Sequence, residues 1–275
     1  MNRKEALYFR EKFEFVPKKR LGQNFLVDRN NIDRIIRACN LSKQDTVLEI
    51  GPGLGALTFE LAKRAGELIV VEIDSRLTNT LRQNLGSYNN ISFKCQDILD
   101  FDFSGYRNLE VIGNLPFYIG SSIVIKLLEH KKAIKSIFIT VQKELAQRML
   151  ASCGDKDYGS FSLFVQYHCQ PRALFSIKRT CFRPQPKVDA AFLNLIIRKK
   201  NEFKVKDEVF LFKIIRKSFS QRRKNIINAL RDLIPKERLL PILTRNNISP
   251  DARAENLALN DFIHLANNEK RNPLN

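Results

Sequence analysis

The 275-residue chain contains no tryptophan, two methionines and three histidines, and it has no long apolar run. Because no stretch approaches the ~20 apolar residues of a membrane-spanning helix, we expect no membrane association. The histidines have no metal-ligand spacing, and the five cysteines are widely spaced without a Cys-x-x-Cys pair. These absences argue against a disulfide framework and a zinc knuckle. We therefore expect no metal and a cytoplasmic protein.

Acidic residues are scarce relative to basic ones, since 29 Asp and Glu stand against 47 Lys and Arg, a formal net charge of +18. Such a charge favours a polyanionic partner, nucleic acid ahead of an anionic membrane. A protein that is merely rich in lysine is the alternative. From Lys199 to Asn275 there are 17 basic and 9 acidic residues, about twice the charge density of the preceding part. This segment is therefore predicted to dock nucleic acid.

Strand-like and helix-like segments alternate over the first half of the chain. The expected strands are Thr46–Ile50, Leu68–Ile73, Ile91–Lys94, Leu109–Ile112 and Ser136–Val141, separated by helices at Ala56–Ala65, Ser75–Leu85 and Ile119–Glu129. This order predicts an α/β fold, a Rossmann-like parallel sheet with helices on both faces. After Lys200 the apolar spacing becomes helical. We predict a catalytic domain at 1–199 and a small, basic, all-helical domain at 200–275.

A glycine turn, with Gly51, Gly53 and Gly55, joins the first expected strand to a helix. Its G-x-G-x-G spacing is neither a dinucleotide fingerprint nor a phosphate loop. Glu72 ends the next strand, where a carboxylate can accept from both ribose hydroxyls, and Asp97 follows the third, placed for an adenine amino group. Ribose and adenine without pyrophosphate indicate S-adenosylmethionine. The alternative is an ordinary turn with a solvated Glu72.

The segment Asn114-Leu115-Pro116-Phe117 follows the fourth expected strand. An exocyclic base nitrogen is a poor nucleophile because its lone pair is delocalised into the ring. Acceptance of both amino hydrogens, by the Asn114 oxygen and the Leu115 carbonyl, would favour the localised, tetrahedral nitrogen of the transition state. Pro116 biases Leu115 toward an extended conformation, and Phe117 offers a flat face for an extruded base. The segment predicts methyl transfer to a nucleobase nitrogen.

The chain resembles the small-subunit ribosomal RNA adenine N6,N6-dimethyltransferases (KsgA type), in order and spacing over nearly its whole length. The motifs that carry the resemblance are Lys19–Leu26, Val47–Thr58, Val71–Asp74, Gln96-Asp97, Gly113–Ile119, Phe182–Asp189 and Phe219–Leu230. The resemblance implies a class I methyltransferase with a helical C-terminal domain. It also implies dimethylation of two adjacent adenosines in the 3′-terminal hairpin loop of small-subunit rRNA, on an immature small subunit during ribosome biogenesis, by a monomeric enzyme.

The resemblance also implies roles for individual residues. Phe182 would stack on the target adenine opposite Phe117. The implied cofactor contacts are Gln23, Asn24, Leu26, Gly51, Gly53, Gly55, Glu72, Ile73, Asp97, Ile98 and Asn114. The family often has Tyr at Phe117, Pro at Ser122 and Ser at Ala190, and none of these departures removes a group that the chemistry requires.

Two basic clusters are candidate rRNA contacts. Lys18, Lys19 and Arg20 precede the first motif, while Arg222, Arg223 and Lys224 are expected to open a helix of the small domain. Such side chains would bind phosphates without reading sequence; a solvated face is the alternative.

Two other functions remain open. A large-subunit rRNA adenine methyltransferase of the macrolide-resistance type would share the fold, but its motif usually reads Asn-Ile-Pro. A non-catalytic RNA-binding assembly factor would not need intact Glu72, Asp97 and Asn114.

Overall fold

The computed structural model describes residues 21–198 and 202–268. The chain divides into two compact units: Met1–Ala146 with Pro171–Ile197, and Gln147–Gln170 with Arg198–Asn275. The boundary between Ile197 and Arg198 lies close to the predicted domain boundary at 199/200. The segment Gln147–Gln170 groups with the helical unit, whereas no sequence pattern separates it from the catalytic domain. The second unit is therefore built from two stretches of chain.

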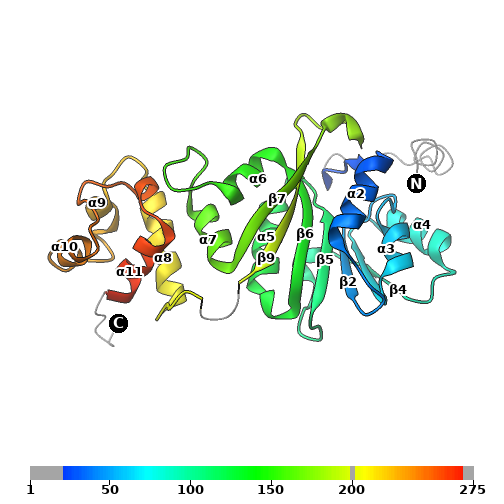
Figure 1. The fold of residues 1–275 in the computed structure, drawn as a ribbon, viewed down its shortest axis with the longest axis horizontal. Helices are drawn as coiled ribbons and strands as arrows, with labels where there is room; N and C mark the ends of the chain where they lie inside the picture. The colour runs from blue at the N-terminus through cyan, green and yellow to red at the C-terminus, as the bar shows by residue number, and fades with distance from the viewer. Residues whose placement is uncertain (1–20, 199–201, 269–275) are drawn as a thin grey trace. The chain divides into compact units, whose positions relative to one another are not determined.

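The first unit is organised around a seven-stranded sheet of order β4-β3-β2-β5-β6-β9-β7. Strands β2 to β6 run parallel and β9 pairs antiparallel with β6, as Figure 1 shows. The α/β fold class is confirmed. The strand bounds are Thr46–Ile50 (β2), Glu67–Glu72 (β3), Ile91–Cys95 (β4), Leu109–Asn114 (β5), Ile134–Gln142 (β6), Cys169–Ile177 (β7) and Ala190–Ile197 (β9).

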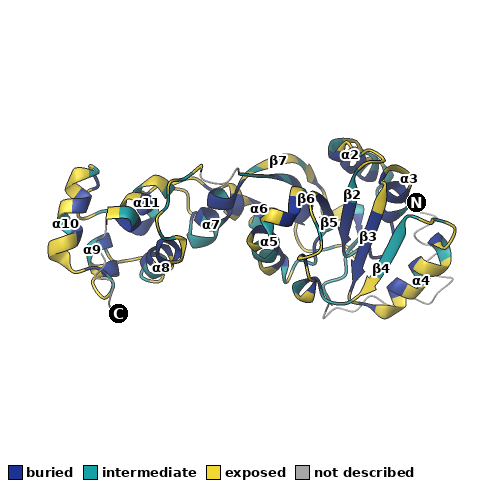
Figure 2. Cartoon of the chain, turned by 90° about the horizontal axis from the view of Figure 1, so that it is seen from below, coloured by how far each residue is buried: buried dark blue, intermediate teal, exposed yellow. Residues whose placement is uncertain are grey.

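Helices cover the sheet because each has one apolar face. In helix α2 (Arg29–Cys39) the buried residues are Ile32, Ile35, Ile36 and Cys39, at helical spacing, and the Asp28 side chain caps its first turn by accepting from Asn31 N. With α3 (Thr58–Arg64), α2 packs on strand residues of one sheet face. Figure 2 shows α4 (Ser75–Leu85) and α5 (Gly120–Glu129) on the other side, with exposed outer faces.

A two-stranded ribbon joins the beginning of the described chain to a distant segment. Strand β1 (Phe25–Leu26) pairs antiparallel with β8 (Phe182–Arg183), so that Leu26 faces Phe182 in register. The ribbon brings the first and the later resemblance motifs together beside the sheet. Helix α6 (Lys143–Leu150) follows β6.

The second unit is a small helical bundle. Its helices are α7 (Ser160–His168), α8 (Glu208–Phe219), α9 (Ile226–Leu230), α10 (Lys236–Arg245) and α11 (Leu259–Asn268). Aromatic rings hold α7 to α8, with Phe212 of α8 centred 5.3 Å from Phe164 and 5.2 Å from Tyr167. None of the described helices is long and apolar enough to cross a bilayer.

The expectation that Gln221–Lys224 opens a helix is wrong. Residues 220–223 form a turn after α8, and α9 begins only at Ile226, where the Asn225 side chain caps it by accepting from Asn228 N. Asn is among the preferred N-cap residues, whereas the basic run before it has no capping acceptor. The cluster is therefore displayed on a turn.

Candidate active site

An open cavity lies where β2, β3 and β5 end, the carboxyl edge at which open α/β sheets bind ligands. Its described lining includes three carboxylates, Glu49, Glu72 and Asp97, and contains no Lys, Arg or His. In a chain of net charge +18, this acidic lining fits a cationic ligand and opposes a phosphate-bearing one.

The glycine turn forms one wall of the cavity. Gly51 and Gly53 line it, both with positive φ, +63° and +58°. A Cβ at Gly53 would lie 2.6 Å from the Phe25 ring, so a side chain there would displace β1. Gly55 also has a positive φ but does not line the cavity; a Cβ there would meet Leu81. Gly55 therefore shapes the turn from behind.

Glu72 is 6% exposed and anchors the turn from the end of β3. Its Oε1 accepts from Asp74 N at 2.9 Å and its Oε2 from Gly53 N at 3.4 Å. Burial raises the pKa of Glu72 to about 7, although these backbone donors oppose the rise. The Arg76 guanidinium and Gln23 hold the pKa of Asp74 below its usual range. Glu72 is thus poised between its two protonation states, whereas Asp74 is ionised.

Asn114 lies at the end of β5 with its amide held in one orientation. Its Nδ2 donates to the carbonyl oxygen of Asn24 at 2.9 Å, and its buried Oδ1 has no hydrogen-bond partner among the described residues. The Asn24 side chain donates in turn to Gly22 O at 3.0 Å. The cavity wall therefore contains a buried acceptor on an amide whose orientation is fixed from behind. A buried acceptor left unpaired costs about 1–3 kcal/mol, which a ligand N–H would recover.

Leu115, Pro116 and Phe117 continue the cavity wall. The Phe117 ring is half-buried, and Tyr118 beside it is 55% exposed. Phe182 is fully buried and does not line the cavity; its ring meets that of Phe117 edge to face, with centroids 6.4 Å apart and planes at 65°. The structure thus brings these two rings together without presenting both to a base.

The remaining predicted cofactor residues line the same cavity. Asp97 follows β4, and its Oδ1 accepts from Leu99 N at 2.9 Å. Gln23, Asn24 and Leu26 reach the cavity from the segment around β1. The other lining residues among those predicted are Ile73 and Ile98.

The family profile described as ribosomal RNA adenine dimethylase matches residues 15–270. The chain belongs to this family. Ribosomal RNA small subunit methyltransferase A of Geobacillus sp. (strain WCH70) is 42% identical over 94% of this chain and 93% of its own. The protein of the same name from Alkaliphilus oremlandii (strain OhILAs) is 40% identical, again over 94% and 93%.

Two solved structures are similar as well. A dimethyladenosine transferase from Plasmodium falciparum has a TM-score of 0.74 and 29% identity, covering 88% of this chain and 95% of that one. The 23S rRNA methyltransferase ErmE has a TM-score of 0.71 and 28% identity, covering 89% and 98%. Like its family, this adenine dimethylase uses S-adenosylmethionine, a cation whose charge matches the acidic cavity.

Sequence reasoning missed several residues that line the cavity of this dimethylase, among them Glu49, Phe25 and Tyr118. Glu49 carried a readable signal, because an ionisable residue interrupts the otherwise apolar strand Val47-Leu48-Glu49-Ile50. Phe25 could not be found in this way, since its place against Gly53 depends on the ribbon between β1 and β8.

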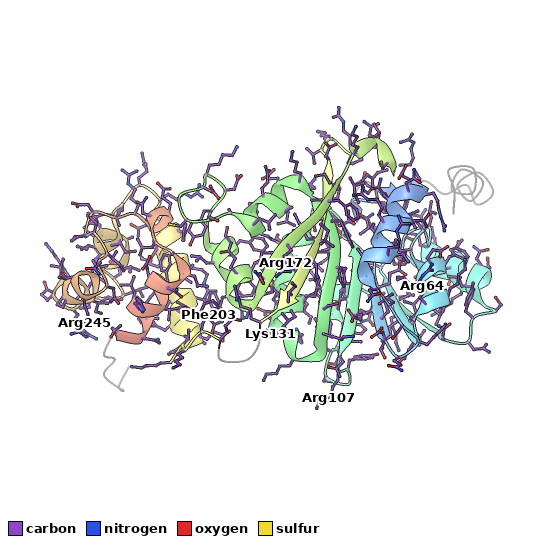
Figure 3. All side chains as sticks on the ribbon, in the orientation of Figure 1. Arg64, Arg107, Lys131, Arg172, Phe203 and Arg245 are labelled. Atoms are coloured by element: carbon purple, nitrogen blue, oxygen red, sulfur yellow. The ribbon has the colours of Figure 1, made fainter. Side chains whose placement is uncertain are left out.

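Arg222, Arg223 and Lys224, which are proposed for RNA, belong to the helical unit and are not among the residues that line the cavity. Arg222, Arg223 and Lys224 are exposed on the turn before α9, where Arg222 Nη2 donates to Tyr158 O at 3.3 Å. Lys18, Lys19 and Arg20 lie outside the described residues. Exposed basic side chains occur on both units; Figure 3 labels Arg64 and Arg107 in the first and Arg245 in the second.

Proposed function

We propose that this adenine dimethylase transfers methyl groups from S-adenosylmethionine to N6 of two adjacent adenosines in the 3′-terminal hairpin loop of small-subunit rRNA. The observation that carries the proposal is Asn114 in the wall of an acidic cavity: the Asn24 carbonyl holds its amide, and its buried Oδ1 has no hydrogen-bond partner among the described residues. The choice of subunit is supported by the names of relatives at 40–42% identity. The large-subunit enzyme and the non-catalytic factor are not favoured.

Asn114 and Leu115 act on the nucleophile. The Asn114 Oδ1 and the Leu115 carbonyl each accept one amino hydrogen, which concentrates the lone pair on N6 as the nitrogen becomes tetrahedral. Acceptors aimed at a group that forms only in the transition state lower the barrier more than they tighten substrate binding. Pro116 keeps Leu115 extended, and Phe117 supports the face of the base.

The donor side of the cavity is assigned to the carboxylates and the glycine turn. Glu72 accepts from the ribose hydroxyls and Asp97 from the adenine amino group, while Gly51 and Gly53 let the backbone approach the donor. S-Adenosylmethionine supplies an activated methyl group, so the reaction needs no metal or protein nucleophile.

Docking is assigned to the two basic clusters. We propose that Lys18, Lys19 and Arg20, together with Arg222, Arg223 and Lys224, contact rRNA phosphates of the immature small subunit. The dimethylase then works as a monomer in the cytoplasm, where these particles assemble.

The test replaces Asn114 by Ala and follows methyl groups from labelled S-adenosylmethionine into separated small and large ribosomal particles. Loss of such an acceptor costs about 2.7–4 kcal/mol of barrier, by analogy with oxyanion-hole deletions, or about 10²–10³ in rate. Folding and RNA binding should persist, because the basic clusters are untouched.

Asn194→Ala is the matched control. Asn194 lies on β9 of the same sheet and also has a buried, unpartnered Oδ1, but it does not line the cavity. Near-normal turnover in Asn114→Ala would remove this residue from the mechanism. Label in large particles alone would overturn the choice of subunit.

A further inference from the structure

Glu49 occupies a distinctive place in the sheet. It lies on β2 in register with Val70 of β3 and Ile112 of β5, so these three side chains share a face. Glu72 and Asn114 lie two residues further along β3 and β5, on that same face. On β2 the corresponding residue is Gly51, which has no side chain. Glu49 is therefore the carboxyl that reaches the space between Glu72 and Asn114.

The carboxyl of Glu49 is enclosed but incompletely satisfied. The residue is 1% exposed and lines the cavity, yet its Oε2 has no hydrogen-bond partner among the described residues. Burial raises its pKa to about 8; the Glu72 carboxylate adds to the rise and the Thr58 hydroxyl of α3 opposes it. The other ionisable groups of the described lining are the carboxyls of Glu72 and Asp97 and the phenol of Tyr118, with no Lys, Arg or His. Without a ligand, Glu49 is thus largely neutral at pH 7.

The order of the strands indicates what Glu49 faces. Strand β2 lies between β3, which carries Glu72, and β5, which carries Asn114. The sulfonium of S-adenosylmethionine links the ribose to the methyl group that is transferred. If Glu72 holds the ribose and Asn114 the acceptor nitrogen, the positive charge lies between them, beside the central strand.

We propose that Glu49 senses the charge of the donor: it ionises when the sulfonium enters and takes a proton back after the methyl group has left. The proton passes from the Glu49 carboxyl to solvent on donor binding and returns from solvent with the neutral product. The cavity thereby favours S-adenosylmethionine over S-adenosylhomocysteine. Since full dimethylation of two adenosines needs four donors, such discrimination speeds exchange. The inference rests on the proposed donor site.

The test measures proton release by isothermal titration calorimetry on the full-length protein at pH 7, in buffers of different ionisation enthalpy. The ligands are S-adenosylmethionine, sinefungin, which carries an amine in place of the sulfonium, and neutral S-adenosylhomocysteine. A carboxyl with a pKa of about 8 is about 0.9 protonated at pH 7, which is the most that one site can release. We expect most of this release with both cationic ligands and little with S-adenosylhomocysteine.

The informative variant is Glu49→Gln, which keeps the shape but cannot ionise. It should abolish the difference in proton release and lower the preference for S-adenosylmethionine over S-adenosylhomocysteine about tenfold, the effect of a two-unit fall in pKa from 8 at pH 7. Glu110→Gln is the matched control. Glu110 is a buried strand carboxyl near the start of β5, paired with Lys135 and outside the cavity.

The outcomes separate this inference from the donor site itself. Equal proton release with charged and neutral ligands, or an unchanged pattern in Glu49→Gln, overturns charge sensing while leaving the donor site intact. Failure of Glu72→Ala to weaken any of the three ligands would instead refute the donor site.

Discussion

Buried carboxyls of the first unit differ in how their charge is compensated. Glu60 accepts from Arg29 at 2.9 Å and Arg64 at 2.6 Å, and although burial opposes it, these partners lower its pKa to about 2. No cationic side chain lines the cavity beside Glu49 and Glu72 among the residues that the structure describes, and burial raises the pKa of both carboxyls. Glu60 thus links α3 to α2 through its ion pair with Arg29. The charge of the cavity carboxyls, in contrast, would be compensated by a bound cationic ligand.

A variant of Phe182 must separate a role in stability from a role in methyl transfer, because its ring is completely buried between the ribbon and the sheet. Truncation to Ala would cost about 3–5 kcal/mol of stability and would not isolate a role in base stacking. Phe182→Leu keeps an apolar side chain, with an expected loss of under about 1.5 kcal/mol, and removes the flat ring. Because the Phe182 ring supports that of Phe117 in the cavity wall, we expect a small fall in Tm and at least a tenfold loss of methyl transfer.

Phe192→Leu provides the matched control. Phe192 is equally buried in the same core cluster, but its ring meets those of Phe138 and Phe175, whereas the Phe182 ring meets that of the cavity residue Phe117. Both variants should lose similar stability, measured by thermal unfolding. If they also lose methyl transfer equally, Phe182 is a core residue and not a stacking face.

At the scale of elements, the turn between α8 and α9 combines an exposed basic run with a well-capped following helix. Replacing Arg222, Arg223 and Lys224 with Ala should weaken binding to small ribosomal particles. It should also reduce the slope of log affinity against log salt by about 0.7–0.9 for each phosphate that the variant no longer neutralises. Affinity for S-adenosylhomocysteine should stay unchanged, because the turn lies outside the donor cavity.

A triple Ala variant at Lys236, Arg238 and Arg245 of α10 removes the same charge from another exposed face of the helical unit. Binding assays over a range of salt concentrations compare the two. Equal changes in slope would mean that net charge, and not the turn, governs docking.

The sequence predicted an element best where the signal lies in the residues of that element alone. Strand β2 and helix α4 have the predicted bounds, because apolar runs and helical spacing are local signals. The joining of Gln147–Gln170 to the helical unit depends on contacts between distant residues, such as Phe164 with Phe212, which no local pattern contains.

The same distinction applies to the site. The glycine turn and the strand-end carboxylates could be located by spacing from the predicted strands. The orientation of the Asn114 amide could not, since it depends on Asn24, which is distant in sequence. The burial of Phe182 likewise follows from the pairing of β8 with β1.

At the scale of the whole molecule, the cavity carboxyls predict an unusual dependence of stability on pH. The pKa of Glu49 is about 8 in the folded protein against an ordinary 4.5. The folded state therefore binds more protons than the unfolded state within this window, and stability falls as pH rises. Thermal unfolding of the ligand-free protein should show a declining Tm from about pH 5 to pH 8.

Glu49→Gln should remove the part of this decline that Glu49 contributes, since the amide stays neutral at every pH, and leave the part that comes from Glu72, whose pKa burial raises to about 7. The carboxyls with lowered pKa values, such as Asp45, Glu60 and Asp74, do not contribute here, because they are ionised in both states above pH 5. Parallel Tm profiles of wild type and variant would show that Glu49 is already ionised without a ligand.

The interleaving of the two units has a consequence for synthesis on the ribosome. Helix α7 emerges well before α8, and its buried residues Leu163 and Tyr167 belong to a cluster whose later members, such as Phe203 and Phe212, are translated after it. At about 5–20 residues per second, α7 waits for seconds with its apolar side uncovered. The sheet is completed meanwhile, because β9 is translated before α8. We therefore expect the nascent chain to expose the apolar side of α7 until α8 has been translated, and a chaperone would protect the chain most in that interval.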